Sequence, residues 1–188
     1  MGNLDPVLAL YFVATSAYTL GLKRYPVADV LVLAGLYTLR VLGGAAAIRV
    51  VPSFWILAFS MFMFFSLALA KRYIELDTMS AAKTSDERAR GYRVQDMPAI
   101  QAMGVASGYM AVLVVALYIN SPDIVGRYGQ VSVLWGLCPV ILFWVSRVWL
   151  KASRSEMHDD PVVFALSDRL SLLATAAAIG VVLMAIAG

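Results

Sequence analysis

Residues 54–77 read FWILAFSMFMFFSLALAKRYIELD, an apolar run that ends abruptly in a charged segment. The apolar part, Phe54–Ala70, contains no charged residue. A run of roughly this length approaches the 20 residues that cross the hydrocarbon core of a bilayer. Because backbone groups in lipid must be paired within the segment, the run predicts a transmembrane helix.

The rest of the chain repeats this pattern. Of its 188 residues 61% are hydrophobic and 14% are charged, whereas a soluble domain has about 25% charged residues. The apolar runs lack the in-out alternation of barrel strands. We therefore predict an all-α polytopic membrane bundle of about six transmembrane helices, with residues 1–188 forming one domain and residues 71–97 forming a cytoplasmic cap loop that is partly helical. The predicted spans are Pro6–Leu22, Val27–Ala47, Phe54–Ala70, Ala99–Asn120, Val131–Leu150 and Val162–Ala187.

Basic residues gather in the loops on one side of these spans. The other side receives only Arg49 and Arg127. The positive-inside rule therefore predicts a multi-pass protein of the plasma (inner) membrane, with its charged loops in the cytoplasm and both termini outside. Such an arrangement is what remains if an odd number of N-terminal helices has been removed. The charged side carries Lys23, Arg24, Lys71, Arg72, Lys83, Arg88, Arg90, Arg93, Lys151 and Arg154.

Several kinds of site are excluded by composition. Cys138 is the sole cysteine and His158 the sole histidine, so there is no intrachain disulfide, cysteine cluster or multi-histidine site. The net charge of +3 suits an anionic leaflet or anionic substrates, and no nucleic-acid motif is present. Gly104 and Gly108 form a small face that allows close helix packing.

The segment Lys71–Asp77 is the first candidate site. If the preceding helix continues, Lys71 and Glu75 lie one turn apart on one face. Cations beside carboxylates suit a phosphorylated substrate with Mg²⁺. The alternative is a helix end whose long side chains reach the membrane surface and form a surface ion pair.

The segment Ser155–Pro161 is the second candidate site. Adjacent carboxylates repel unless a cation lies between them, so Asp159 and Asp160 beside His158 predict a metal or a basic partner. The alternative is a solvated turn in which Asp160 lies near the start of the last helix and Pro161 is its first residue.

A basic stripe and a set of intramembrane charges complete the candidates. Arg147, Lys151 and Arg154 share one helical face and could clamp a diphosphate or contact lipid headgroups. A set of charged residues also lies within the predicted spans. Charged side chains are costly at that depth and usually face the bundle interior or a polar cavity. These residues are Asp29 and Arg40, which are eleven residues apart and so share a face, and Asp168 with Arg169. A structural ion pair among them is the alternative.

Four stretches carry a family resemblance. They are YTLGLKRYPVADVLVLAGLYTLRVLGGAAA (residues 18–47), SFWILAFSMFMFFSLALAKRYIEL (53–76), RGYRVQD (90–96) and MHDDPVVFALSDRLS (157–171). They resemble the UbiA-type intramembrane prenyltransferase family. Within it they look most like the decaprenyl-phosphate phosphoribosyltransferase branch, including members in which a haloacid-dehalogenase-type domain precedes the membrane part.

The resemblance implies nine transmembrane helices around a cavity that opens to the cytoplasm and to lipid. It also implies Mg²⁺-dependent transfer, in that branch from phosphoribosyl diphosphate to a polyprenyl phosphate, with a place in cell wall biosynthesis. The family's second polar motif falls on Lys71, Arg72 and Glu75, which become the candidate catalytic residues, with Asp77 as a weaker candidate. The other candidate roles are phosphate binding by Lys23, Arg147, Lys151 and Arg154, metal binding by Glu75, Asp159 and Asp160, and cavity lining by Asp29, Arg40 and Asp168.

The sequence departs from the family in one respect. The family's first motif, an Asn-Asp-x-x-Asp run, has no match, since Asn3-Leu4-Asp5 differs from it. The chain therefore resembles the C-terminal two-thirds of such an enzyme, and a fragment, a truncated product and half of a split protein are all consistent with it. A missing N-terminal half would then be a partner, and the chain alone would lack the main metal-binding carboxylates. The alternative functions are prenyl transfer from a prenyl diphosphate to an aromatic acceptor and a non-catalytic transporter or scaffold subunit.

Overall fold

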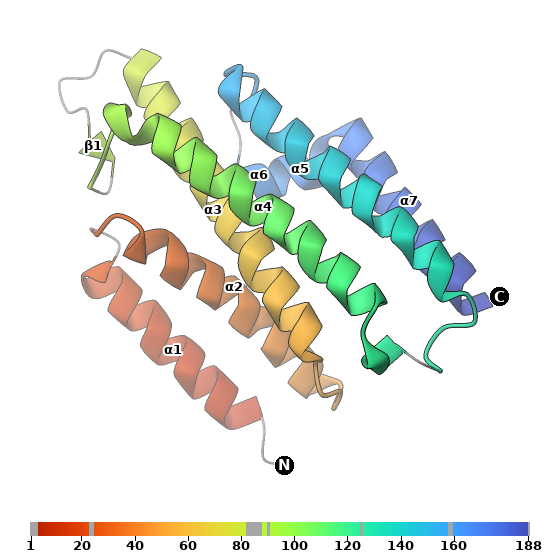
Figure 1. Ribbon diagram of the computed structural model, residues 1–188. Helices are drawn as coiled ribbons and strands as arrows, with labels where there is room; N and C mark the ends of the chain where they lie inside the picture. The colour runs from red at the N-terminus through yellow and green to blue at the C-terminus, as the bar shows by residue number, and fades with distance from the viewer. Residues whose placement is uncertain are drawn as a thin grey trace.

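The computed structural model describes residues 4–22, 25–81, 88–89, 91–124, 126–157 and 160–187. The described chain is an all-α bundle with one short hairpin (Figure 1). Five helical segments are long and apolar enough to cross a membrane. The predicted polytopic all-α membrane bundle is thereby confirmed.

The described elements are one hairpin, three 3-10 turns and helices of two lengths. The hairpin strands are β1 (Arg88–Ala89) and β2 (Tyr92–Arg93), and three 3-10 turns are η2 (Val94–Asp96), η3 (Pro122–Ile124) and η4 (Val131–Gly136). The shorter helices are α1 (Leu4–Leu20) and α6 (Pro161–Ser167). The long helices are α2 (Ala28–Ala47), α3 (Phe54–Ala81), α4 (Met97–Ile119), α5 (Leu137–Ser153) and α7 (Arg169–Ala187).

Helices α3 and α4 form the centre of the bundle. Helix α2 packs on α3 and carries α1 on its outer side, while α5, α6 and α7 lie on the other side of the central pair (Figure 1). Successive long helices run in opposite directions. The C-terminal ends of α1, α3 and α5 therefore lie at one end of the bundle, which we call the charged end, and both chain termini lie at the opposite end.

The centre is closed by small residues. Ser66 of α3 donates a hydrogen bond to the carbonyl oxygen of Gly104 at 2.7 Å, and the indole nitrogen of Trp149 donates one to the Ser66 oxygen at 3.0 Å. A Cβ atom on Gly104 would lie 1.9 Å from the Trp149 ring, and one on Gly108 would lie 2.4 Å from Val145. The small face predicted at Gly104 and Gly108 is thus the place where α4 meets α3 and α5.

Two boundaries differ from the sequence prediction. Helix α3 continues beyond the predicted span to Ala81, so the helical part predicted within residues 71–97 is its start, and the hairpin and η2 occupy the described remainder. The predicted last span, Val162–Ala187, is interrupted at Asp168. The Asp168 carboxylate accepts the backbone N–H of Ser171 at 2.9 Å and so caps the start of α7.

Candidate functional site

A buried arginine organises the charged end. Arg72 of α3 is fully buried. Its Nε lies 2.5 Å from one oxygen of Asp29, its Nη2 lies 3.2 Å from the other, and its Nη1 lies 2.6 Å from Glu75. The Tyr18 hydroxyl of α1 donates a hydrogen bond to Asp29 at 2.8 Å. Because buried charges are stable only when they are paired and hydrogen-bonded, these four residues tie α1, α2 and α3 together.

The hairpin closes this cluster on one side. Tyr92 of β2 is buried, and its hydroxyl accepts the backbone N–H of Val27 at 2.6 Å. Val27 immediately precedes α2 and has a φ of 68°, which strains a β-branched residue. Burial is the largest cause that raises the pKa of the Tyr92 phenol. The hydrogen bond from the Val27 N–H lowers this pKa, and the negative charge of Asp29 raises it further. Tyr92 therefore holds the start of α2 as a neutral group.

Lys71 faces the other way from its neighbour Arg72. It forms an ion pair with Asp160, which precedes α6. The two side chains are 37% and 27% exposed. The pair therefore joins α3 to the start of α6 at a place that water and solutes can reach.

The basic stripe of α5 lies beside α6. Arg147 forms a two-pronged ion pair with Asp168, with N···O distances of 2.7 and 3.1 Å. The Arg147 guanidinium carbon lies 5.6 Å from the centre of the Phe164 ring, and the Lys151 ammonium lies 5.4 Å from it. Both cations thus lie within cation–π distance of one aromatic ring. Arg154 follows the end of α5 and is exposed.

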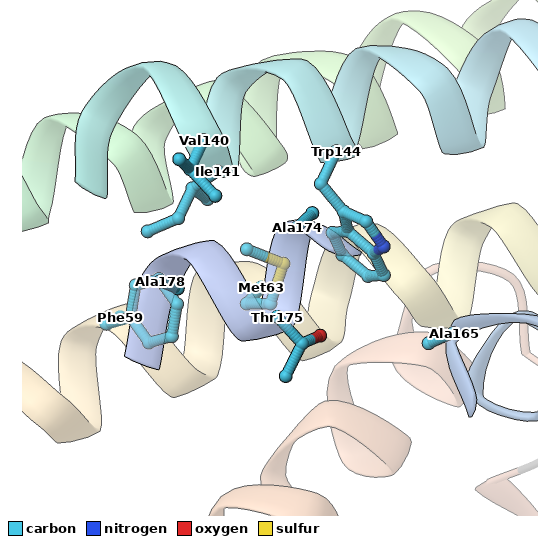
Figure 2. Close-up of a pocket in the computed structure, with 9 residues that line it drawn as sticks. All are labelled: Phe59, Met63, Val140, Ile141, Trp144, Ala165, Ala174, Thr175 and Ala178. Carbon is cyan, nitrogen blue, oxygen red and sulfur yellow. The ribbon is translucent and has the colours of Figure 1, made fainter. Parts of the chain in front are cut away.

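An apolar cavity opens next to this stripe, between α3, α5, α6 and α7 (Figure 2). Its volume is about 220 Å³. Figure 2 shows Trp144 and Ile141 pointing from α5 into the cavity toward Met63 of α3. The one polar residue in its lining is Thr175, whose hydroxyl donates to the backbone oxygen of Ser171. The lining residues are Phe59, Met63, Val140, Ile141, Trp144, Ala165, Ala174, Thr175 and Ala178.

Arg40 lies apart from the charged end. Its Nη2 and Nε donate hydrogen bonds to the Tyr11 hydroxyl of α1 at 2.9 and 3.2 Å, and its guanidinium carbon lies 4.9 Å from the centre of the Tyr37 ring. Asp29 and Arg40 share the face of α2 that meets α1, because each contacts an α1 tyrosine. They do not pair with one another, since Asp29 is bound to Arg72.

The structure brings some predicted site residues together and separates others. Asp29, Arg72 and Glu75 form one cluster, Lys71 and Asp160 a second, and Arg147, Lys151 and Asp168 a third. Neither these residues nor Arg40 line the cavity of Figure 2. The cavity-lining role of Asp29, Arg40 and Asp168 stays a prediction. Lys23, His158 and Asp159 lie outside the described residues.

The candidate magnesium ligands whose positions the structure describes are Glu75 and Asp160. No group of three His, Cys, Asp or Glu side chains gathers in the described ranges. Glu75 is bound to Arg72, and Asp160 to Lys71. Mg²⁺ usually takes one or two carboxylates together with substrate phosphates and water, so a magnesium site at this end of the bundle stays a prediction.

Three aromatic residues of the site were not anticipated from the sequence. Tyr18 and Tyr92 supply hydroxyls to the Asp29 region, and Phe164 supplies the ring under two cations. A signal existed for all three, since Tyr18, Tyr92 and Phe164 lie within the stretches that carry the family resemblance. No spacing rule assigns Phe164 a cation, because contacts across helices depend on how the helices pack.

The fold and the charged end define a multi-pass all-α membrane protein with a basic and acidic cluster at one end of its bundle. No protein-family model matches the chain. It is similar to the uncharacterized protein y4nM of Sinorhizobium fredii, at 34% identity over 166 residues, which are 88% of this chain and 32% of that protein. It is also similar to the nodulation protein NoeC of Azorhizobium caulinodans, at 31% identity over 171 residues, which are 91% of this chain and 56% of NoeC. The chain therefore spans about a third and just over half of the lengths of these two relatives.

Proposed function

We propose that this chain forms part of a membrane transferase of the UbiA type that acts on a polyprenyl phosphate, with phosphoribosyl diphosphate as the donor. The proposal places the charged end in the cytoplasm, in agreement with the positive-inside rule. It rests on the sequence resemblance and on one feature of α5.

That feature is a single helix face that changes from apolar to basic. Ile141 and Trp144 of α5 point into the apolar cavity. Arg147 and Lys151 continue along the same face, at spacings of three and four residues, and lie over Phe164. Ala165, the residue after Phe164, lines the cavity. A polyprenyl phosphate has the same polarity, because its apolar chain is joined to an anionic head.

The cations at the charged end would have different roles in this reaction. Lys71 and Lys151 are partly exposed and are available to neutralise phosphate. Arg72 is buried between two carboxylates, so it would position Glu75 rather than contact substrate. Departure of a diphosphate is assisted by cations that neutralise its developing charge.

The proposal also includes Mg²⁺, for which Glu75 and Asp160 are the described candidate ligands. Further ligands would have to come from Asp159, outside the described residues, or from a segment with the family's first acidic motif. Lys71 and Lys151 act in the proposal through their own charge.

The test is a transfer assay in membranes that contain this chain together with the part of NoeC outside its match. Labelled phosphoribosyl diphosphate and polyprenyl phosphate are supplied with and without Mg²⁺, and labelled lipid is extracted. A Mg²⁺-dependent lipid product that falls at least tenfold in Lys151→Met, but not in the opposite-end variant Arg127→Met, is the expected result. Absence of any labelled lipid from every membrane preparation would refute the phosphoribosyl assignment.

A non-catalytic scaffold is the second candidate, and one observation favours it. Arg72 and Arg147 are each bound to carboxylates of the chain itself, as structural ion pairs are. A scaffold would bind polyprenyl phosphate no better than neutral polyprenol. Equal retention of the two lipids by the purified chain, with no effect of Lys151→Met, would support this candidate.

A further inference from the structure

Arg40 presents a charge on the outer side of the bundle at a depth where lipid would surround it. It lies twelve residues beyond Ala28, the first residue of α2, which is about 18 Å along the helix axis. The remaining seven residues to Ala47 span about 10 Å. Arg40 is nevertheless exposed in this chain.

The side chain also points away from the nearer membrane surface. Side chains on a helix lean toward its N-terminus, and the Arg40 guanidinium lies over Tyr37, one turn closer to the N-terminus. The Tyr11 hydroxyl holds it there with two hydrogen bonds. Arg40 therefore does not extend toward the nearer headgroups, as basic residues near helix ends commonly do.

Among the side chains that the structure describes, no acid compensates the charge of Arg40. Its partners are the phenol groups of Tyr11 and Tyr37, and no acid whose side chain is described forms an ion pair with it. Asp29, the one acid of α2, is fully buried and bound to Arg72. Because a charged side chain within a membrane normally faces protein or a polar cavity, this face of α1 and α2 is not a lipid-facing surface.

We propose that the outer face of α1 and α2 around Arg40 docks a transmembrane helix that carries an aspartate or glutamate at the depth of Arg40. Its source is the additional polypeptide that the longer relatives possess, of which this chain spans 32% and 56%. Exposed apolar side chains of α1 next in sequence to Tyr11, including Phe12 and Val13 at 73% and 62% exposure, supply the packing surface. The ion pair between that carboxylate and Arg40 fixes how the docked helix is aligned along α2. The inference concerns assembly and does not depend on the transferase proposal.

The test uses the complete chain with an affinity tag, co-expressed with the part of NoeC outside its match to this chain as a separate polypeptide. The two are extracted in mild detergent, and the amount of NoeC segment retained per tagged chain is measured. Arg40→Lys should retain the segment. Arg40→Leu should lower retention at least about threefold, in keeping with the strength of polar contacts between membrane helices, and Arg40→Glu should lower it more. Arg127→Leu, in the segment between η3 and η4, is the control and should behave as wild type.

A charge exchange then identifies the partner residue. Each acid within the apolar runs of the NoeC segment is changed to lysine in turn, and one such change should restore retention to Arg40→Glu. Size-exclusion profiles of each variant establish that a loss of retention does not come from misfolding. Failure of the wild-type chain to retain the segment, or retention that no Arg40 substitution alters, would overturn the proposal. So would disulfide cross-linking between two copies of Val13→Cys, since a second copy would then occupy the face.

Discussion

The contact between Gly104 and Trp149 allows a quantitative prediction about the centre of the bundle. Replacing Gly104 by alanine places a methyl carbon 1.9 Å from the Trp149 ring, whereas nonbonded carbons approach to about 3.5 Å. The indole or the helix must therefore move by about 1.5 Å. Trp149 is 3% exposed and packs edge-on against Tyr73 at 6.1 Å, so it has little space to move into.

The size of the effect follows from three contributions. Inserting a methyl group into a packed core costs about 1–3 kcal/mol. Displacement of the indole also loses the 3.0 Å hydrogen bond to Ser66, and such bonds between membrane helices contribute about 0.6 kcal/mol on average. The gain in helix propensity from glycine to alanine offsets about 0.5–1 kcal/mol. G104A should therefore lower the free energy of unfolding by about 1–3 kcal/mol.

Gly35 provides the control for this experiment. It also lies within a helix, but a Cβ atom there would meet nothing within 4 Å. G35A should be neutral or more stable by up to about 1 kcal/mol. Unfolding is followed by SDS titration of the protein in mixed micelles, with tryptophan fluorescence as the readout. Equal unfolding midpoints for G104A and G35A would refute the close packing of α4 against α5.

Three further predictions concern the charged end and use the same unfolding assay. Arg72→Leu should cost about 3–5 kcal/mol, because it leaves the Asp29 carboxylate buried without its partner, and adding Asp29→Asn should recover part of the loss; an unchanged double variant would contradict the pairing. Tyr92→Phe should cost about 1–2 kcal/mol through the lost hydrogen bond from Val27. Since the folded pKa of Tyr92 is raised, the stability that its hydroxyl contributes should be fully present below a pH of about 10 and should be lost as the pH rises further. The Tyr92→Phe variant should lack that part of the pH dependence of stability. Lys71→Ala should cost less than about 1 kcal/mol, because its ion pair is partly exposed.

Hydropathy located the membrane helices but not all of their ends. The predicted span Phe54–Ala70 marks where the chain leaves the apolar region, whereas α3 continues to Ala81. Its continuation packs Tyr73, Ile74 and Leu76 against the bundle. A helix end is set by such contacts and by capping, and a loss of hydropathy reports neither. The interruption at Asp168 escaped prediction for the same reason, since its capping contact with Ser171 lies within an otherwise apolar run.

The sequence indicated which end of the bundle carries the charges, but not which charges pair. Lys71 and Arg72 are adjacent in the chain, yet one helical step of about 100° separates their directions. Lys71 turns toward Asp160 at the surface, and Arg72 turns inward to Asp29. Only the packing of α2 and α6 on opposite sides of α3 decides between these partners. A motif of neighbouring cations therefore predicts a polar site without assigning its roles.

This division of roles bears on how the charged end could bind an anion. Arg72 is shared by Asp29 and Glu75, so the three groups together carry a net negative charge when ionised and would repel a phosphate. An anion would instead meet the cations that are exposed or partly exposed, namely Lys71, Lys151 and Arg154. It would have to compete with Asp160 for Lys71, and this competition costs little because the pair is partly exposed. The buried cluster thus fixes the positions of α1, α2 and α3, and the outer cations remain free to exchange a carboxylate for a phosphate.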